Sequence, residues 1–440
     1  MDYKDKNFTD DMYDLIKRLY PICRSITGKG VVESLEIVRD IIPIEIKNLP
    51  SGTQVFDWTV PKEWNIKDAY IKNSRGEKIV DFKKSNLNVL NYSVPVHMKM
   101  SLKELKKHLY TLPDYPDWVP YLTSYYKKNW GFCMTQNQYD KLEDDTYEVV
   151  INSTLEDGYL TYGEYFLRGK TDDEVLFTCY VCHPSMCNDN LSGISLITYL
   201  AKELSKLDLK YSYRFLFIPE TIGAITWLSL NQDKVDKIKY GLVATCCGDG
   251  GELTYKKTRN GTENIDKIVQ EVLRESGFEY NIIDFFPLGS DERQFCSPGF
   301  NLPVGSLMRT PYGRFPEYHT SADNLEFIDK YKLEETLKRY LDTVYFIENN
   351  GKYINLNPKC EPQLGKRGLY SMLGSQKKST KYQVAMLWIL NYSDGNNSLL
   401  DIAKQSNIDF YTIKQCTDML VENNLLKYEE NNEIIDNIHR

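Results

Sequence analysis

The sequence predicts an α/β protein whose main domain is a mostly parallel sheet flanked by helices. Three apolar runs, Val175–Cys182, Tyr213–Ile218 and Tyr240–Cys247, have the length and continuity of buried strands, and helical patterns follow the first two. Apolar strands joined by helices are typical of parallel sheets that are covered on both faces. Two other stretches differ in pattern, and they predict a β-rich insert and a small C-terminal helical unit.

The helices are predicted from apolar residues at helical spacing. Near the N-terminal end, Thr9-Asp10-Asp11 offers a helix cap, and apolar residues follow it at the right spacing. After the first strand, the apolar residues again form one stripe. Further helices are expected at Val31–Ile41, Asn190–Leu207, Asn264–Ser276 and Lys330–Asn349.

Changes in pattern also set the expected domain boundaries. Residues 46–155 consist of short alternating runs broken by Gly, Pro and Asn, which indicates a β-rich insert. Residues 351–378 are polar and rich in Gly, Pro and Lys, so we interpret them as a linker. Residues 379–440 carry three helical patterns and a hairpin signal, in the order of a winged-helix domain. Residues 1–45 and 156–350 then form the main α/β domain.

Composition narrows the class of protein. Of the 440 residues, 42% are hydrophobic and 26% are charged, which is ordinary for a folded globular chain. The net charge of −8 gives no reason to expect nucleic acid or an anionic membrane as a partner. We see neither a signal peptide nor an apolar run long enough to span a membrane, so a cytoplasmic location without membrane contact is expected.

Side chains with metal-ligand chemistry follow the strand-like runs. His183 comes after the first run, and Asp189 opens the next helix; His319, one of five histidines, lies far along the chain. Open α/β sheets build their sites at the carboxyl ends of the strands, and imidazole and carboxylate are zinc ligands. A metal cluster of these three residues is therefore predicted. The alternatives are a histidine bonded to backbone for His183 and a helix cap for Asp189.

Glu220 is the predicted general base. It follows the apolar strand that ends at Ile218-Pro219, where burial would raise the pKa of its carboxyl group. A carboxylate whose pKa is raised in this way can accept a proton near neutral pH. A salt-bridged glutamate at a strand end is the alternative.

A polar phrase framed by apolar residues, PLGSDERQF, is a candidate substrate loop. We expect Ser290, Asp291 and Arg293 to face a substrate, and Arg293 with Arg309 to hold a carboxylate or phosphate through paired hydrogen bonds. A solvated loop is the alternative. The role of Cys246 and Asp249, near the end of the third strand, stays open.

Aromatic residues are concentrated in one part of the insert. We interpret this group as the aromatic core of a β-module, and the alternative is that it shapes the substrate cleft. The group consists of Trp118, Tyr121, Tyr125, Tyr126 and Trp130.

The order of these motifs resembles that of the zinc exopeptidase superfamily of bacterial aminopeptidases and glutaminyl cyclases. The first His of that family corresponds to His183, the bridging Asp to Asp189, and the Tyr-His-Thr motif ends the series at His319. More closely, the chain resembles an uncharacterised aminopeptidase-like family with a β-insert and a C-terminal winged helix, often associated with polysaccharide biosynthesis. The phrases CHPSMCNDNLSG, IPETIG, GSDERQF and PEYHTSADN carry this resemblance over most of the chain.

The resemblance implies a zinc-dependent amide hydrolase acting on a peptide or an amino-sugar intermediate. Two positions depart from the superfamily pattern: Ser185 replaces the carboxylate two residues after the first His, and Thr221 replaces the ligating second Glu. The implied site is therefore one zinc held by three ligands with an open water position, and two ions remain an alternative. Glu220 would deprotonate the water, and the metal would polarise a carbonyl.

Two further classes of function stay open. The departures at Ser185 and Thr221 also fit a degenerate peptidase fold that serves as a ligand-binding or scaffold protein. A DNA-binding regulator is disfavoured, because the presumed recognition helix Phe410–Glu422 carries Lys414 against Asp418 and Glu422, whereas phosphate contact needs clustered basic residues. A protein–protein role, or homo-oligomerisation through the C-terminal domain, fits that helix better.

Overall fold

The computed structural model describes residues 6–369 and 376–429. It divides into two compact units, which we describe separately. The first comprises Met1–Lys267 with Phe278–Leu341, and the second comprises Ile268–Gly277 with Asp342–Arg440. No helix in the described part of the chain is both long and apolar enough to cross a membrane.

A mixed eight-stranded sheet forms the centre of the first unit. Strands β12, β11, β13 and β16 are parallel to one another, as predicted for the buried centre, whereas β10 and β14 join them in antiparallel orientation. In sheet order the strands are β1 Glu45–Pro50, β10 Tyr159–Leu167, β12 Ser212–Ile218, β11 Glu174–Tyr180, β13 Ile238–Val243, β16 Val304–Met308, β14 Leu253–Lys256 and β15 Tyr280–Ile283.

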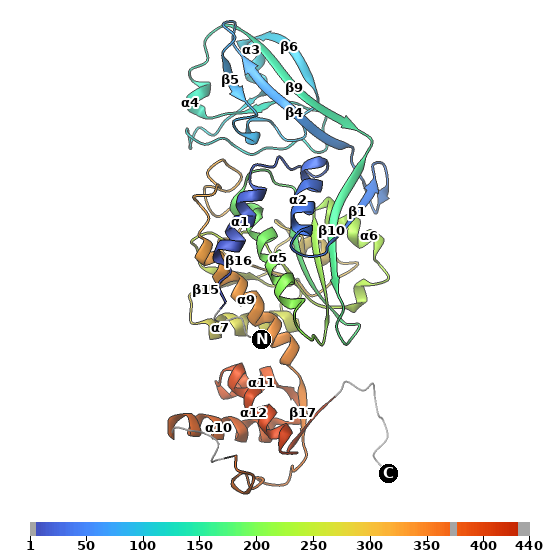
Figure 1. Ribbon diagram of the computed structural model, residues 1–440, viewed down its shortest axis with the longest axis vertical. Coiled ribbons are helices and arrows are strands. Elements are labelled where there is room, and N and C mark those ends of the chain that lie inside the picture. The colour runs from blue at the N-terminus through green and yellow to red at the C-terminus, as the bar shows by residue number, and fades with distance from the viewer. Residues whose placement is uncertain (1–5, 370–375, 430–440) are drawn as a thin grey trace. The chain divides into compact units, whose positions relative to one another are not determined.

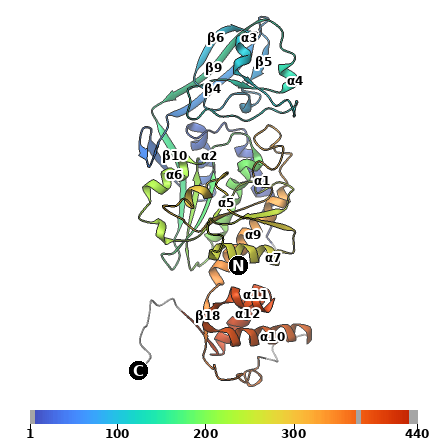
Figure 2. The same cartoon turned by 180° about the vertical axis from the view of Figure 1, so that it is seen from behind.

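Helices cover this sheet, and Figures 1 and 2 show it from two opposite sides. Helix α1 packs against α5, which packs on β11, because both helices carry an apolar stripe. The helices that lie wholly within this unit are α1 Thr9–Leu19, α2 Lys29–Arg39, α5 Ser192–Leu204, α6 Ile222–Leu230 and α8 Glu292–Phe295, with short turns at Cys187–Leu191 and Val235–Lys237. Two further helices, α7 Asn264–Ser276 and α9 Lys330–Asn349, begin in the first unit and end in the second.

Strands β11 and β12 form the buried centre of the sheet. Every residue of both strands is buried, so their side chains pack on both faces of the sheet. Each fully buried Leu or Phe contributes about 1.5–3 kcal/mol relative to an exposed one. Tyr340 of α9 ties this layer together, because its hydroxyl donates to the carbonyl oxygens of Leu307 and Val243 at 2.7 and 3.2 Å.

The insert forms its own four-stranded sheet, ordered β5-β4-β9-β6, with a separate apolar core. Its elements are β2 Gln54–Val55, β3 Trp58–Thr59, β4 Glu63–Lys72, β5 Lys78–Asp81, a turn at Asn86–Asn88, β6 Val96–Ser101, α3 Leu102–Leu105, a turn at Lys106–His108, β7 Leu109–Tyr110, β8 Phe132–Cys133, α4 Gln136–Tyr139 and β9 Thr146–Glu156. The start differs from the predicted boundary at residue 46, because β1 pairs with β10 and so belongs to the main sheet.

The second unit combines α10, α11 and α12, and the ends of α7 and α9, with the small sheet β18-β17-β19. Its elements are β17 Lys352–Asn355, a turn at Gly365–Arg367, α10 Gln376–Tyr392, β18 Asp394–Ser398, α11 Leu399–Ser406, α12 Phe410–Glu422 and β19 Leu426–Tyr428. The segment 351–378 is therefore not only a linker, since β17 lies within it and pairs with both other strands. The predicted hairpin is described up to residue 429, and the rest of it lies outside the described residues.

Local side-chain chemistry explains where α11 and α12 begin. Ser398 and Asp401 form a capping box at the start of α11, and the Asp409 carboxylate accepts the Thr412 N–H at 2.8 Å at the start of α12. Such caps satisfy N–H groups that have no partner within the helix. These short helices therefore have boundaries that their own sequence specifies.

Candidate metal centre

Three of the predicted site residues come together beyond the carboxyl ends of β11 and β12. The His319 Nε2 atom lies 3.0 Å from Asp189 Oδ2, and the His183 Nε2 atom lies 3.9 Å from the same oxygen. Glu220 joins them, since its Oε2 atom is 3.7 Å from His183 Nε2. The topology of the sheet thus brings residues far apart in sequence to one point, as expected for an open α/β fold.

The donor set fits a divalent metal such as zinc. Ligand atoms of His183, Asp189 and His319 all lie within 4.8 Å of one another. Two of these atoms, Asp189 Oδ2 and His319 Nε2, are buried, and within the described residues they face only each other, at 3.0 Å, with no hydrogen bond to a third group. A metal ion at this point would bond to each of the two atoms.

Electrostatics keep the two most buried groups in ligating form. Burial lowers the pKa of His183 to about 4, so its imidazole is neutral near pH 7. Burial opposes ionisation of Asp189, but His183 and His319 outweigh it and hold the pKa of this carboxyl below its usual value. Metal ligands must be deprotonated, so both groups are prepared for coordination.

Neighbouring groups fix the orientation of Asp189. The Tyr180 hydroxyl donates to Asp189 Oδ1 and lies 2.7 Å from the Thr245 hydroxyl. Behind this segment, the Asp323 carboxylate accepts the N–H groups of Asn188 and Asp189 at 2.6 and 2.9 Å. Partners of this kind orient metal ligands and tune their affinity. The sequence analysis missed both Tyr180 and Asp323.

Glu220 lies at the edge of the cluster with its side chain 27% exposed. Burial, together with the nearby carboxyl groups of Asp291 and Asp189, raises the pKa of Glu220 well above its usual value. The Cys182 thiol accepts the Glu220 N–H at 3.3 Å, and Cys182, His183 and Glu220 form a second group of close ligand atoms. Cys182 therefore adjoins the site, a placement that the strand pattern alone did not indicate.

The candidate substrate loop lies behind Thr221. The Asp291 carboxylate accepts the Thr221 N–H at 2.7 Å, and Arg293 Nη2 donates to the Thr221 hydroxyl at 2.9 Å. Thr221 has a φ of +64°, a conformation that costs energy for a β-branched residue. Asp291 and Ser290 are buried, whereas Arg293 lines the pocket above the cluster. Of the three, only Arg293 lines that pocket.

Arg309 and Asp249 are placed elsewhere. The buried Arg309 guanidinium donates to the Lys332 carbonyl and the Thr336 hydroxyl at 3.1 Å each, and it also pairs with Glu335. These bonds tie α9 to the sheet, so the structure does not support the expected role of Arg309 in holding a substrate. Asp249 likewise bonds the Thr310 hydroxyl at 2.6 Å and is no part of the cluster.

Aromatic residues of the insert form one wall of the pocket at the cluster. The pocket has a volume of about 460 Å³, and Trp58, Tyr121, Tyr125 and Tyr126 line it together with His183. The Tyr121 hydroxyl lies 2.8 Å from that of Tyr125. Each interpretation of the aromatic group thus applies to some of its members. Tyr121, Tyr125 and Tyr126 line the pocket, whereas Trp130 packs on the core of the insert.

Comparison with known proteins identifies the chain. A family model described as Domain of unknown function (DUF4910) matches residues 13–350, and a winged helix-turn-helix model matches residues 351–428. The chain belongs to the DUF4910 family. A relative from Clostridium acetobutylicum is 62% identical over 417 residues, covering 95% of this chain and 96% of its own. Its name refers to polysaccharide biosynthesis and an aminopeptidase-like domain.

Solved structures agree with this assignment. A crystal structure from Clostridium acetobutylicum, described as that of a candidate peptidase, has a TM-score of 0.92 at 60% identity and covers 96% of each chain. The zinc aminopeptidase BSAP from Bacillus subtilis has a TM-score of 0.56 at 13% identity, over 77% of this chain and 94% of its own. The predicted aminopeptidase-like α/β fold and C-terminal winged helix of this DUF4910 protein are thereby confirmed, and so is the predicted family.

Proposed function

We propose that this DUF4910 protein is a zinc-dependent hydrolase that cleaves an amide bond in a peptide or an amino-sugar intermediate. The observation that carries the proposal is the cluster of His183, Asp189 and His319, in which two buried ligand atoms lack any other partner among the described residues. A zinc ion held there would supply Lewis-acid activation of the amide carbonyl and of water. The proposal is supported by the names of two relatives, one of which refers to polysaccharide biosynthesis and an aminopeptidase-like domain and the other to a peptidase.

Glu220 is the proposed general base. Its raised pKa allows the carboxylate to accept a proton from water and to return it to the leaving nitrogen, so that the proton is conserved over the cycle. Arg293 at the pocket lining is the proposed contact for a substrate carboxylate, together with the hydroxyl of Thr221, to which it is bonded. The aromatic wall excludes water from one side of this site.

One ion is proposed rather than two. The second close group shares His183 with the first, so the two groups do not offer independent ligand sets. Thr221, where the resemblance places a ligating Glu, contributes its hydroxyl to Arg293 instead. This feature also favours the second candidate, a catalytically inactive ligand-binding or scaffold protein.

Metal content is the first test. Elemental analysis of the purified protein should find about one equivalent of zinc, which is lost in His183→Ala and in His319→Ala. His97→Ala is a matched control, because His97 is exposed on the insert and should leave the zinc content unchanged. A wild-type protein that takes up no zinc, even when zinc is supplied during refolding, would contradict the proposal and favour the scaffold.

Replacing the proposed base separates catalysis from metal binding. Glu220→Gln keeps the shape of the side chain but cannot accept the proton, so turnover should fall by at least about 100-fold. The measurement is hydrolysis of a panel of aminoacyl p-nitroanilides and N-acetylated amino sugars, with zinc content measured in parallel. Unchanged zinc with lost turnover supports the role of base, and retained turnover refutes it.

For the winged-helix unit we propose a protein–protein or dimerisation role. In α12, Lys414 is bonded to both carboxylate oxygens of Asp418 at 2.5 and 2.7 Å, so its charge is already neutralised. Binding to DNA depends on basic groups that can replace counterions on phosphates. Sedimentation of the full chain should show an oligomer, and retardation of DNA in a gel at low salt would contradict the proposal.

A further inference from the structure

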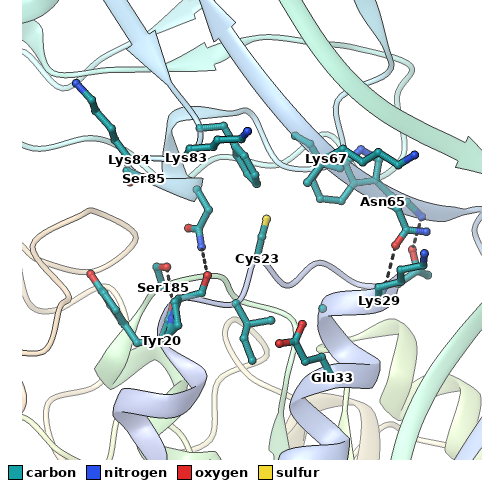
Figure 3. A pocket seen from close by; sticks show the side chains of 18 residues that line it. Tyr20, Cys23, Lys29, Glu33, Asn65, Lys67, Lys83, Lys84, Ser85 and Ser185 are labelled. Atoms are coloured by element: carbon teal, nitrogen blue, oxygen red, sulfur yellow. Dashed lines mark hydrogen bonds between the residues drawn. The ribbon is translucent and has the colours of Figure 1, made fainter.

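A second cavity lies apart from the metal centre in the first unit. Its volume is about 620 Å³, and it lies between the loop that joins α1 to α2 and the insert segments β4 and Phe82–Asn86 (Figure 3). Cys23 and Thr27 line this cavity, whereas Ile26 lines the pocket of the metal centre, so the loop separates the two. A cavity of this size suits a small-molecule ligand.

Lysine side chains from both walls surround this cavity. Figure 3 shows Lys83 and Lys67 on the insert side and Lys29 on the helix α2 side, while Lys84 extends away from the centre. Lys83 has a distant ion pair with Asp68 at 3.6 Å, and within residues 6–369 and 376–429 neither Lys29 nor Lys67 forms one. Ammonium groups such as those of Lys29 and Lys67, which line one cavity without a carboxylate partner, favour an anionic ligand, and phosphate is a common one.

Hydrogen-bond acceptors line the cavity as well, Glu33 from α2 and Asn86 from the insert. In Figure 3 the Glu33 carboxylate points toward the space beside Cys23, and in the described part of the chain it forms no ion pair. Asn86 also lines the cavity, and its side-chain Oδ1 atom is buried and accepts no hydrogen bond from the described residues. Carboxylate and amide oxygens accept hydrogen bonds from hydroxyl groups. The cavity therefore presents both cations and hydroxyl acceptors.

We propose that this cavity binds a phosphorylated sugar. The lysines would hold the phosphate, and Glu33 and Asn86 would accept hydrogen bonds from the sugar hydroxyls. The first turn of α2, where Gly30 lines the cavity, adds the positive end of an 11-residue helix. Binding here needs neither zinc nor Glu220, so it can succeed or fail independently of the proposed hydrolase activity.

The cavity adjoins the loop that carries His183. Ser185 lines the cavity, and its hydroxyl donates to the Tyr20 carbonyl at 2.7 Å. The buried Arg24, in the loop that joins α1 to α2, donates to the His183 carbonyl at 2.9 Å. A ligand against Tyr20 and Ser185 would thus contact the backbone that positions a metal ligand. Zinc content is therefore measured for every variant below.

The test is calorimetric titration of the full chain with glucose 1-phosphate, N-acetylglucosamine 1-phosphate, glucose and inorganic phosphate. At least one sugar phosphate should bind more tightly than glucose or inorganic phosphate, and Lys67→Ala/Lys83→Ala should weaken it by at least about 10-fold. Glu33→Gln should weaken binding of the sugar phosphate but should leave binding of inorganic phosphate unchanged. These side chains are exposed, so the variants should fold normally.

Lys99→Ala is the matched control, because Lys99 is an exposed lysine of the insert that does not line the cavity. It should bind the sugar phosphate as the wild type does. The proposal is overturned if no sugar phosphate binds at about 10 mM, or if glucose or inorganic phosphate binds equally well. It is also overturned if the double lysine variant binds like Lys99→Ala.

Discussion

At the residue scale, the metal centre depends on how burial is compensated. Asp189 is fully buried, and its charge is tolerated because two imidazoles and the Tyr180 hydroxyl surround its carboxylate. An unpaired buried carboxylate would instead take up a proton. The same burial keeps His183 neutral, so the protonation states needed for metal binding arise from packing and not from exposure to solvent.

Tyr180→Phe tests this compensation. Removing the hydroxyl deletes the hydrogen bond to Asp189 Oδ1, so zinc affinity should fall by about 10-fold or more. Tyr340→Phe is the control: it also removes a buried hydroxyl, but one that donates to the Leu307 and Val243 carbonyls. Competition with a chromophoric chelator measures both affinities. Equal affinity in Tyr180→Phe and the wild type would show that Asp189 needs no such partner.

At the element scale, short helices depend on the groups at their ends. In the second unit, the N–H of Phe410 at the start of α12 donates to the Glu275 carboxylate at 2.8 Å, and Phe410 stacks on Phe346 at 4.2 Å. Burial raises the pKa of Glu275 from 4.5 to about 7, despite this hydrogen bond. The contact between α7 and α12 therefore responds to pH.

The direction of the response follows from proton binding. Between pH 4.5 and about 7, Glu275 holds more protons in the folded state than in the unfolded chain, so the free energy of unfolding should fall as pH rises through this window. Glu275→Gln should remove that part of the pH dependence. Thermal unfolding of the second unit within the full chain, followed at several pH values, measures this pH dependence. A wild-type profile identical to that of Glu275→Gln would contradict the shift.

At the scale of the whole molecule, the insert is fitted against the main domain at α2. Gly28 precedes α2 with a φ of +99°, and a Cβ atom there would lie 2.0 Å from the Trp64 carbonyl oxygen of β4. Trp64 is itself buried, and its indole N–H donates to the Ser93 carbonyl at 2.8 Å. Close approach of backbone to backbone at this point is what permits the insert to contact α2.

Gly28→Ala should therefore destabilise the first unit by more than about 2 kcal/mol, since it adds a clash to an unfavourable φ. Gly52→Ala isolates the second effect, because Gly52 has a similar φ of +84° and open space around it. Denaturant unfolding compares the two variants. If both lose the same stability, the close approach at Trp64 contributes nothing.

The sequence by itself determined the class of the fold and singled out the residues of the candidate metal centre. Strands β11 and β12 were recognisable because most of their residues are apolar, and α7 and α9 because apolar residues repeat at helical spacing. His183 and Asp189 followed from their place after the first apolar run, and His319 from its chemistry and from the order of motifs in the resembling family; the structure brings the three together.

Only the tertiary structure decided which other groups surround the site. Arg309 and Arg293 share the same chemistry in sequence, but packing commits the first to α9 and leaves the second at the pocket. Tyr121 and Trp130 belong to one aromatic stretch, yet they take part in different packing. Short-range sequence patterns do not predict such contacts, because the contacts arise between segments that approach one another only when the chain folds.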